Sequence, residues 1–197
     1  IPTDEEGTEV AARIYTRDGR DGAIRRARFS RTHLSPSVSV PWKGRLRGLA
    51  VRGFGGQPRT VENLEAGVEL EVGGSSPEGP ANISRVAIPQ DMPASSFGLI
   101  LNGFIRMPRK GIYTFFLSSD DGSRLTVGDQ VVVDHDGPHS MSERAGQMAL
   151  HRGWHPIEIR YFQGGGGYGL HLEVEGPGMS RREVPAHWLA HVPGPSE

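Results

Sequence analysis

The most informative stretch of the sequence reads Gly111-Ile112-Tyr113-Thr114-Phe115-Phe116-Leu117-Ser118-Ser119-Asp120-Asp121-Gly122-Ser123-Arg124-Leu125. Tyr113, Phe115 and Leu117 occupy alternate positions, which is typical of a strand with one buried face. Aromatic and β-branched residues also favour the extended conformation. The run ends at Asp120-Asp121-Gly122, and a new apolar run begins almost at once. The stretch therefore predicts a strand, a tight polar corner and a second strand.

The two adjacent aspartates at this corner have two explanations. In an extended chain, neighbouring side chains point to opposite faces, so ordinary strand geometry does not bring both carboxylates to one cation. A turn can do so, and so can a cis peptide bond between Asp120 and Asp121. Oxygen ligands at this density suit calcium better than zinc. The alternative is a solvated Asp-Gly corner in which Asp120 caps the turn.

Length and composition limit the classes of protein that fit. The chain has 197 residues with 28 Gly, 15 Pro and 36% hydrophobic residues, which favours many short strands joined by tight turns. Its formal net charge of −1 predicts no general attraction to nucleic acid or to an anionic membrane. The absence of cysteine excludes disulfides and thiolate metal sites.

The ends and the apolar runs of the sequence are also informative. No apolar run has transmembrane length, so membrane insertion is not expected, and the acidic start does not resemble a signal peptide. A first residue other than Met is typical of a mature end or of a piece of a longer chain. Secretion is compatible with these features.

Further strands are expected along most of the chain, and no segment has sustained helical periodicity. Asp18-Gly19 and Gly128-Asp129 read as hairpin turns between strands. The expected strands cover residues 9–17, 27–30, 38–40, 46–51, 97–107, 130–133, 146–150, 154–162 and 170–175. The fold class is therefore all-β.

The segment Asp134-His135-Asp136-Gly137-Pro138-His139 permits two metal interpretations and one structural interpretation. It does not fit an EF-hand loop, because Ala145 stands where the bidentate glutamate belongs. A zinc site formed by His135, Asp136 and His139 lacks the usual closed ligand set. Polar loop residues that fix a turn are the simpler explanation.

A glycine-rich segment, Gln163-Gly164-Gly165-Gly166-Gly167-Tyr168-Gly169, follows the strand expected at residues 154–162. Consecutive glycines permit unusual backbone angles and leave carbonyl oxygens uncovered. The segment matches neither a dinucleotide fingerprint nor a Walker loop. Downstream, Glu173 and Glu175 share one strand face. Two carboxylates on the same face do not provide the acid and the nucleophile that a glycosidase needs on opposite sides of a cleft. No nucleophile-elbow motif is present, so catalysis is not expected.

These motifs occur in the order found in a known family. The sequence closely resembles the PA14 domain family over residues 49–189, and a PA14 domain at residues 49–192 is expected. The resemblance implies an antiparallel β-sandwich or barrel. The matching segments are Gly111-Ile112-Tyr113-Thr114-Phe115, Ser119-Asp120-Asp121-Gly122-Ser123-Arg124-Leu125, Val132-Val133-Asp134-His135-Asp136-Gly137-Pro138-His139, Leu150-His151-Arg152-Gly153-Trp154-His155-Pro156-Ile157, Tyr161-Phe162-Gln163, Glu175-Gly176-Pro177-Gly178 and Val184-Pro185-Ala186-His187-Trp188-Leu189.

The start of the chain has a second, shorter resemblance. Ala12-Arg13-Ile14-Tyr15-Thr16-Arg17-Asp18-Gly19 is similar to an element of the C-terminal β-sandwich module of chitobiase and β-hexosaminidase-like enzymes. The segment lacks the proline-bearing stretch usually seen after the glycine. This resemblance implies a partial immunoglobulin-like β module at residues 1–48.

The PA14 resemblance also implies a calcium site. In calcium-dependent sugar-binding members, two consecutive aspartates joined by a cis peptide bond bind the ion together with a later loop, and sugar hydroxyls complete the coordination. By motif position, the ligands here would be Asp120, Asp121, the Gln163 side chain and the carbonyls of Gly165 and Gly167. Gln163 departs from the asparagine of the fungal adhesins. The carbohydrate would contact Asp120, Asp121, His135, His139, Gly166 and Tyr168.

The function implied is that of a noncatalytic, calcium-dependent carbohydrate-binding module. Such domains are commonly accessory parts of glycoside hydrolases, sulfatases, adhesins and toxins, so the partners would be a glycan and a catalytic domain of the same parent chain. The resemblance implies an extracellular, periplasmic or cell-surface location. The alternative is a structural spacer or protein-interaction module without sugar binding, in which the aspartates only shape a turn.

Overall fold

The chain folds into two compact units, one ending at His33 and the other beginning at Leu34. The computed structural model describes residues 8–15, 21–29, 33–41, 43–73 and 81–193. Among its described residues, the first unit has one antiparallel pair of strands, β1 (Thr8–Tyr15) and β2 (Asp21–Phe29). The turn expected at Asp18-Gly19 lies outside the described residues, and the immunoglobulin-like module stays a prediction.

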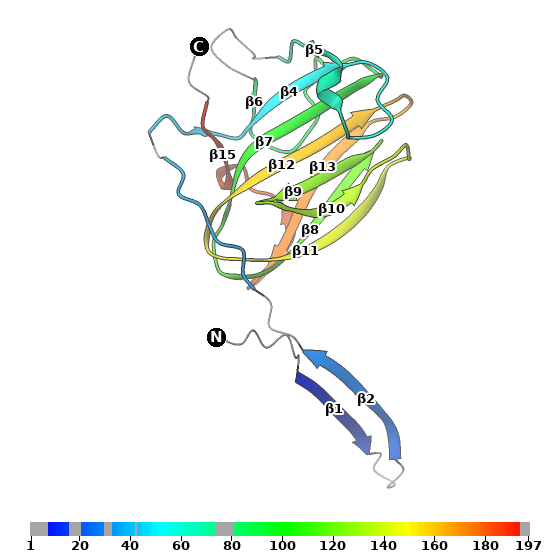
Figure 1. Ribbon diagram of the computed structural model, residues 1–197, viewed down its shortest axis with the longest axis vertical. Coiled ribbons are helices and arrows are strands. Elements are labelled where there is room, and N and C mark those ends of the chain that lie inside the picture. Colours follow the sequence, from blue (N-terminus) through cyan, green and yellow to red (C-terminus); the bar gives the residue numbers. More distant parts are fainter. Residues whose placement is uncertain (1–7, 16–20, 30–32, 42, 74–80, 194–197) are drawn as a thin grey trace. The chain divides into compact units, whose positions relative to one another are not determined.

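The part of the second unit that the structure describes forms two antiparallel sheets, confirming the expected all-β fold (Figure 1). The larger sheet has the strand order β10-β9-β12-β7-β15-β3, and β4 pairs with β7 and with the short strands β5 and β6. Its strands are β3 (Leu46–Arg47), β4 (Leu49–Gly55), β5 (Val68–Leu70), β6 (Ala81–Ile83), β7 (Phe97–Met107), β9 (Ser123–Val127), β10 (Gln130–His135), β12 (Gly153–Gln163) and β15 (Leu189–His191).

The smaller sheet has the order β11-β8-β13-β14. Two short 3₁₀ turns, η1 (Leu64–Ala66) and η2 (Ala186–Trp188), are the helical segments among the described residues. Neither of these turns has the length and apolar character that a membrane span requires. The strands of this sheet are β8 (Gly111–Asp120), β11 (Ser142–Leu150), β13 (Gly169–Gly176) and β14 (Met179–Glu183).

The segment before β4 belongs to the second unit rather than to the first. Ser35 N–H donates to Ala149 O at 2.8 Å, and Val38 N–H donates to Trp154 O at 2.8 Å. Both bonds tie this segment to residues of the second unit. The compact units therefore divide at residues 33/34, whereas the sequence prediction set the boundary at residues 48/49.

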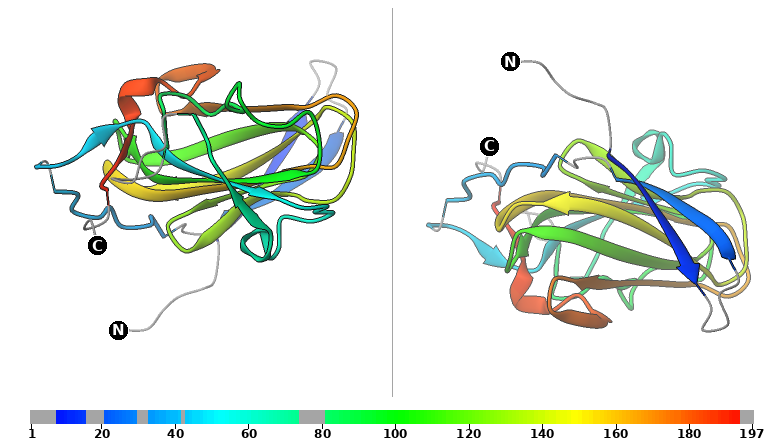
Figure 2. Two further views of the ribbon diagram at one scale, coloured as in Figure 1. Left: turned by 90° about the horizontal axis from the view of Figure 1, so that it is seen from above. Right: turned by 90° about the horizontal axis from the view of Figure 1, so that it is seen from below.

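The core lies between the two sheets, whose arrangement is visible in the turned views of Figure 2. The expected alternation in β8 is confirmed, because Tyr113, Phe115 and Leu117 are each at most 1% exposed. From the facing sheet, Ile159 and Tyr161 of β12 are also fully buried. Each sheet contributes alternate residues of its strands to the core, so the polar residues at the intervening strand positions face outward.

Three connections cross from one sheet to the other at the same end of the sandwich. Residues 121–122 join β8 to β9, residues 136–141 join β10 to β11, and residues 164–168 join β12 to β13. Gly122 is required in the first connection, because a Cβ there would lie 2.4 Å from Phe162 Cε1 and 2.8 Å from Gly137 N. The backbones of the first two connections therefore lie in close contact at Gly122 and Gly137.

Truncating a buried side chain of β8 should destabilise the fold far more than truncating an exposed one on the same strand. Leu117→Ala is expected to lower the free energy of unfolding by about 2–5 kcal/mol, because it leaves a cavity between the sheets. The matched control is Ile112→Ala, at a position that is 54% exposed, with an expected cost below about 1 kcal/mol. Urea unfolding of both variants measures the difference, and equal losses would contradict the assigned core.

Candidate functional site

Both aspartate side chains face the glycine-rich segment between β12 and β13. The peptide bond between Asp120 and Asp121 is cis. A Cβ built on Gly164 would lie 3.4 Å from Asp121 Oδ2, and one built on Gly167 would lie 3.4 Å from Asp120 Oδ2. Neighbouring residues that would point apart in an extended strand therefore present their carboxylates to the same loop.

Backbone N–H groups from the other two crossovers donate to these carboxylates. Asp121 is 8% exposed, and its oxygens accept from His139 N at 3.0 Å and from Gly164 N at 2.9 Å. Asp120 Oδ2 accepts from Met141 N at 3.2 Å. The aspartates thus tie all three crossovers together, which a merely solvated corner would not do.

The paired carboxylates have no cationic partner among the residues that the structure describes. The ion pairs of these residues involve Arg52, Arg124, Arg160 and Arg181, and each of these binds other acids. Two adjacent negative charges, one of them on a buried group, repel each other unless a cation offsets them. The arrangement is therefore a candidate metal centre.

The Tyr161 hydroxyl contacts the backbone of the aspartate pair. Its hydroxyl lies 2.5 Å from Asp120 O, to which it donates, and 3.1 Å from Gln163 Oε1. Burial, followed by the negative charges of Asp120 and Asp121, raises the pKa of Tyr161 well above its usual value. The phenol therefore remains a protonated donor at any physiological pH.

Gln163 lies within this cluster with its carboxamide turned inward. The residue is fully buried, and its Nε2 donates to Gly167 O at 2.9 Å while its Oε1 faces the Tyr161 hydroxyl. Exchanging the two ends of the carboxamide would bring its oxygen against the Gly167 carbonyl. In this arrangement Gln163 fixes the position of Gly167, and its role as a direct metal ligand stays a prediction.

The rest of the glycine-rich segment is open to solvent. No atom lies within 4 Å of a Cβ built on Gly165 or Gly166, and Gly166 has a positive φ of 89°. Tyr168 is 55% exposed at the end of the segment. The predicted ligands Asp120, Asp121, Gln163 and Gly167 are thus brought together, and Gly165, Gly166 and Tyr168 lie on the exposed side of the same loop.

The two histidines predicted to line the site have different surroundings. Their rings stack with centroids 3.9 Å apart, and His135 is only 5% exposed. Burial, then the charges of His139 and Arg144, lowers the pKa of His135. The His139 ring nitrogens lie 2.9 Å from Ser140 O and 3.1 Å from His135 O. The His135 ring is therefore buried beneath the loop, whereas His139 is partly exposed and reaches the site through its backbone N–H.

A zinc site does not form at this loop. Within the described ranges, no group of three or more His, Cys, Asp or Glu side chains is arranged to hold a metal ion. Asp136 Oδ1 instead accepts from Val61 N and from Gly137 N, both at 2.8 Å. The structural interpretation of residues 134–139 therefore fits better than the zinc interpretation.

The structure adds residues to the site that the sequence analysis missed. A cleft of about 340 Å³ opens beside Asp121, and one of its walls comes from the connection between β4 and η1. A sequence pattern had no means of assigning this connection to the site, because it lies more than sixty residues before the aspartates. The cleft is lined by Gln57, Pro58, Arg59, Ser96, Asp121, Pro138, Phe162, Gly164 and Gly165.

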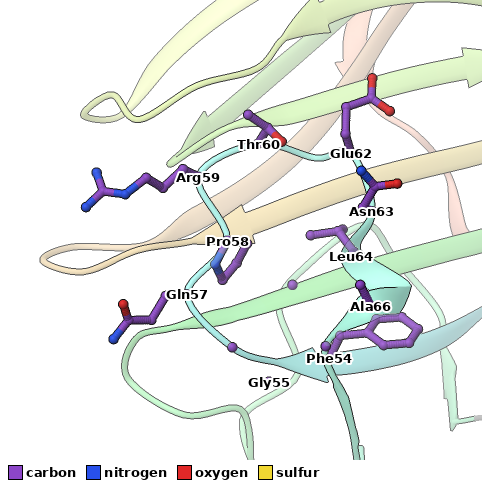
Figure 3. A pocket seen from close by; sticks show the side chains of 13 residues that line it. Phe54, Gly55, Gln57, Pro58, Arg59, Thr60, Glu62, Asn63, Leu64 and Ala66 are labelled. Carbon is purple, nitrogen blue, oxygen red and sulfur yellow. The ribbon is translucent and has the colours of Figure 1, made fainter.

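The same connection also borders a second hollow of about 290 Å³. This hollow is bounded by Phe54 and Leu64, and Figure 3 shows the side chains of Gln57 and Arg59 pointing away from both. Gln57, Pro58 and Arg59 thus line both this hollow and the cleft that contains Asp121.

The donor set of the aspartate site fits a hard divalent cation. Carboxylate oxygens from two residues lie beside a loop of exposed glycines, and calcium takes 6–8 oxygen ligands, among them carboxylates and backbone carbonyls. Asp120 Oδ1 accepts no hydrogen bond from the described residues, so it is available as a ligand. The two aspartates offer only oxygen ligands, whereas zinc is bound mostly by Cys sulfur and His nitrogen.

Comparisons with known proteins agree with this architecture. Residues 62–188 match the PA14 domain. The PA14 domain of the antifreeze protein MpAFP superposes with a TM-score of 0.61 at 15% identity, covering 82% of this chain and 98% of that one. An anti-sigma factor domain-containing protein gives a TM-score of 0.63 at 17% identity over 76% of this chain, which spans only 50% of that protein.

Sugar-binding proteins are among the similar structures. The PA14 sugar-binding domain from an RTX adhesin has a TM-score of 0.54 at 19% identity, covering 74% of this chain and 99% of that one. The epithelial adhesin 9 A domain from Candida glabrata, in complex with Galβ1-3GlcNAc, has a TM-score of 0.65 at 12% identity, covering 85% of this chain and 99% of that one. No curated protein sequence matches the chain.

Removing the Gln163 carboxamide should loosen the glycine-rich segment. Gln163→Leu is expected to lower the free energy of unfolding by about 1–2 kcal/mol, because Gly167 O loses its donor. Amide deuterium exchange in residues 164–168 should accelerate at the same time. Gln130→Leu, at an exposed position in β10, is the control and should change neither quantity. Unchanged exchange in the Gln163 variant would contradict the positioning role.

Proposed function

Because this chain belongs to the PA14 domain family, we propose that it is a noncatalytic carbohydrate-binding module that recognises sugar hydroxyls through a calcium ion. Asp120 and Asp121 would hold the ion, together with backbone carbonyls of the glycine-rich segment at Gly165 and Gly167. When bound, the calcium ion supplies open coordination positions to a pair of neighbouring sugar hydroxyls.

The proposal depends above all on the uncompensated pair of carboxylates. Two side chains at one corner, one of them buried, face an open loop and have no cationic partner among the described residues. A divalent cation would offset this charge beside a loop of exposed glycines.

The surroundings of the pair suit a small polar ligand. The four glycines at residues 164–167 carry no side chains that would fill the space above the carboxylates. Tyr168 is exposed at the end of this loop, where its ring offers an apolar face for a sugar ring. The inward carboxamide of Gln163 keeps the Gly167 backbone in position, so the loop is held before any ligand arrives.

The chemical class of the ligand is supported by relatives rather than by the site alone. The RTX adhesin domain is described as sugar-binding, and the Candida glabrata adhesin domain is in complex with a galactose-containing disaccharide. A module appended to a carbohydrate-active enzyme or to a surface protein, acting outside the cell, is consistent with these adhesins.

A catalytic role has less support from the geometry. Glycoside hydrolysis needs two carboxylates on opposite sides of the scissile bond. Asp120 and Asp121 instead lie side by side on one wall, and both accept backbone hydrogen bonds. Glu173 accepts from Arg181 Nε at 2.8 Å on the outer face of β13, away from the cleft.

Calcium titration by calorimetry tests the proposal. The protein should bind one calcium ion, and Asp120→Asn should weaken that affinity by at least about tenfold, since it removes one of two ligand charges. At a calcium concentration of about 100 times Kd, the free energy of unfolding should rise by about 2.7 kcal/mol. Neutral hexoses should then bind only in the presence of calcium.

The matched control is Asp129→Asn, at an exposed aspartate in the turn between β9 and β10. It should bind calcium and sugar as the unmodified protein does. Circular dichroism of each variant separates loss of the site from loss of the fold. If the unmodified protein neither binds calcium nor responds to any hexose, a spacer or protein-interaction role replaces the proposed function.

A further inference from the structure

The wall of the cleft formed by residues 56–61 is anchored at both of its ends. Gly56 N–H donates to Ser96 O at 3.2 Å, and Val61 N–H donates to Asp136 Oδ1 at 2.8 Å. Val61 is also fully buried in a small apolar cluster with Phe162. Pro58 restricts the backbone between these anchors. The segment therefore presents its side chains to the cleft from a defined backbone.

Arg59 is the cationic side chain on this wall. The acids that follow it along the chain already have partners, because Glu62 binds Arg124 Nη1 at 2.5 Å and Glu65 binds Arg160 Nη2 at 2.7 Å. Within the described residues, Arg59 forms no ion pair. Its guanidinium is thus available to a ligand, with up to five donors in a planar arrangement.

The charge of the cleft changes sign when calcium binds. Asp121 and Arg59 are the charged residues that line it, and Asp120 lies next to Asp121. One divalent cation cancels the two carboxylates, so the positive charge of Arg59 remains without compensation. A guanidinium matches a carboxylate or a sulfate by paired, charge-assisted hydrogen bonds.

From this arrangement we infer that the cleft selects an anionic saccharide. Arg59 binds a carboxylate or sulfate ester on the sugar whose hydroxyls the calcium ion holds, or on the adjoining sugar. The inference depends on the proposed calcium-dependent function and adds the ligand class to it. The cleft volume of about 340 Å³ falls within the usual range for small-molecule sites.

Matched neutral and acidic sugars test the inference. In saturating calcium and low salt, calorimetry or NMR titration should compare methyl glycosides of glucose and galactose with those of glucuronate and galacturonate, and with galactose 6-sulfate. At least one acidic probe should bind about fivefold or more tightly than its neutral counterpart. The uronate and sulfate probes distinguish which anionic group the cleft accepts.

Arg59→Gln should remove the preference for the acidic probe and leave affinity for the neutral sugar within about twofold. Arg59→Lys should keep part of the preference, because the charge remains while the planar donor pair is lost. Arg152→Gln, at an exposed arginine in the turn between β11 and β12, is the control and should behave as the unmodified protein. Added salt should reduce the preference by screening the charge.

Two results would overturn the inference in different ways. If neutral sugars bind with calcium but acidic probes bind no better, or if the preference survives in Arg59→Gln, the role of Arg59 is wrong and calcium-dependent sugar binding stands. If calcium binds but no saccharide does, the proposed carbohydrate function and this inference fail together.

Discussion

The carboxylate of Asp121 connects the three chain crossovers at one end of the sandwich. Its oxygens accept N–H groups from the β10–β11 connection and from the β12–β13 connection, while its own backbone forms the β8–β9 connection. Each crossover passes from one sheet to the other, so none can pair as part of a regular strand ladder. A buried acceptor shared between them supplies the hydrogen bonds that the ladder cannot.

This arrangement determines which residues the neighbouring positions tolerate. Gly122 must be glycine because Phe162 and Gly137 occupy the space of a side chain, and Phe162 N–H donates to Gly122 O at 2.9 Å. Phe162 in turn packs with Val61, whose N–H reaches Asp136 of the β10–β11 connection. The packing of the corner and the position of the β4–η1 wall therefore have a common origin.

Much of the fold follows from local pattern, and most of the site does not. The apolar run at residues 97–107, which ends at the turn Pro108-Arg109-Lys110-Gly111, predicts β7 with its observed bounds. In contrast, β11 begins four residues before its predicted start. Residues 142–145 are exposed at the edge of the smaller sheet, so they carry no apolar alternation for a sequence pattern to detect.

The expectation that the aspartates meet the glycine-rich segment came from family resemblance, since about forty residues separate them. Gln163 turns inward beside the Tyr161 hydroxyl, and the segment that carries Arg59 is anchored by a hydrogen bond between Val61 and Asp136, 75 residues apart. Such contacts are properties of the tertiary structure, and no local spacing encodes them.

Because the two carboxylates accept hydrogen bonds from the backbone, the stability of the fold does not depend on the binding of an ion. Three backbone N–H groups already donate to Asp120 and Asp121, so the crossovers hold their positions through hydrogen bonds within the chain. A site that formed only around its metal would tie folding to the ion. Here the core between the sheets maintains the fold, and an ion would add charge compensation to a corner that is already assembled. Affinity at such a site is governed by how much repulsion the cation relieves and by how many loop carbonyls turn toward it, not by the cost of ordering the chain.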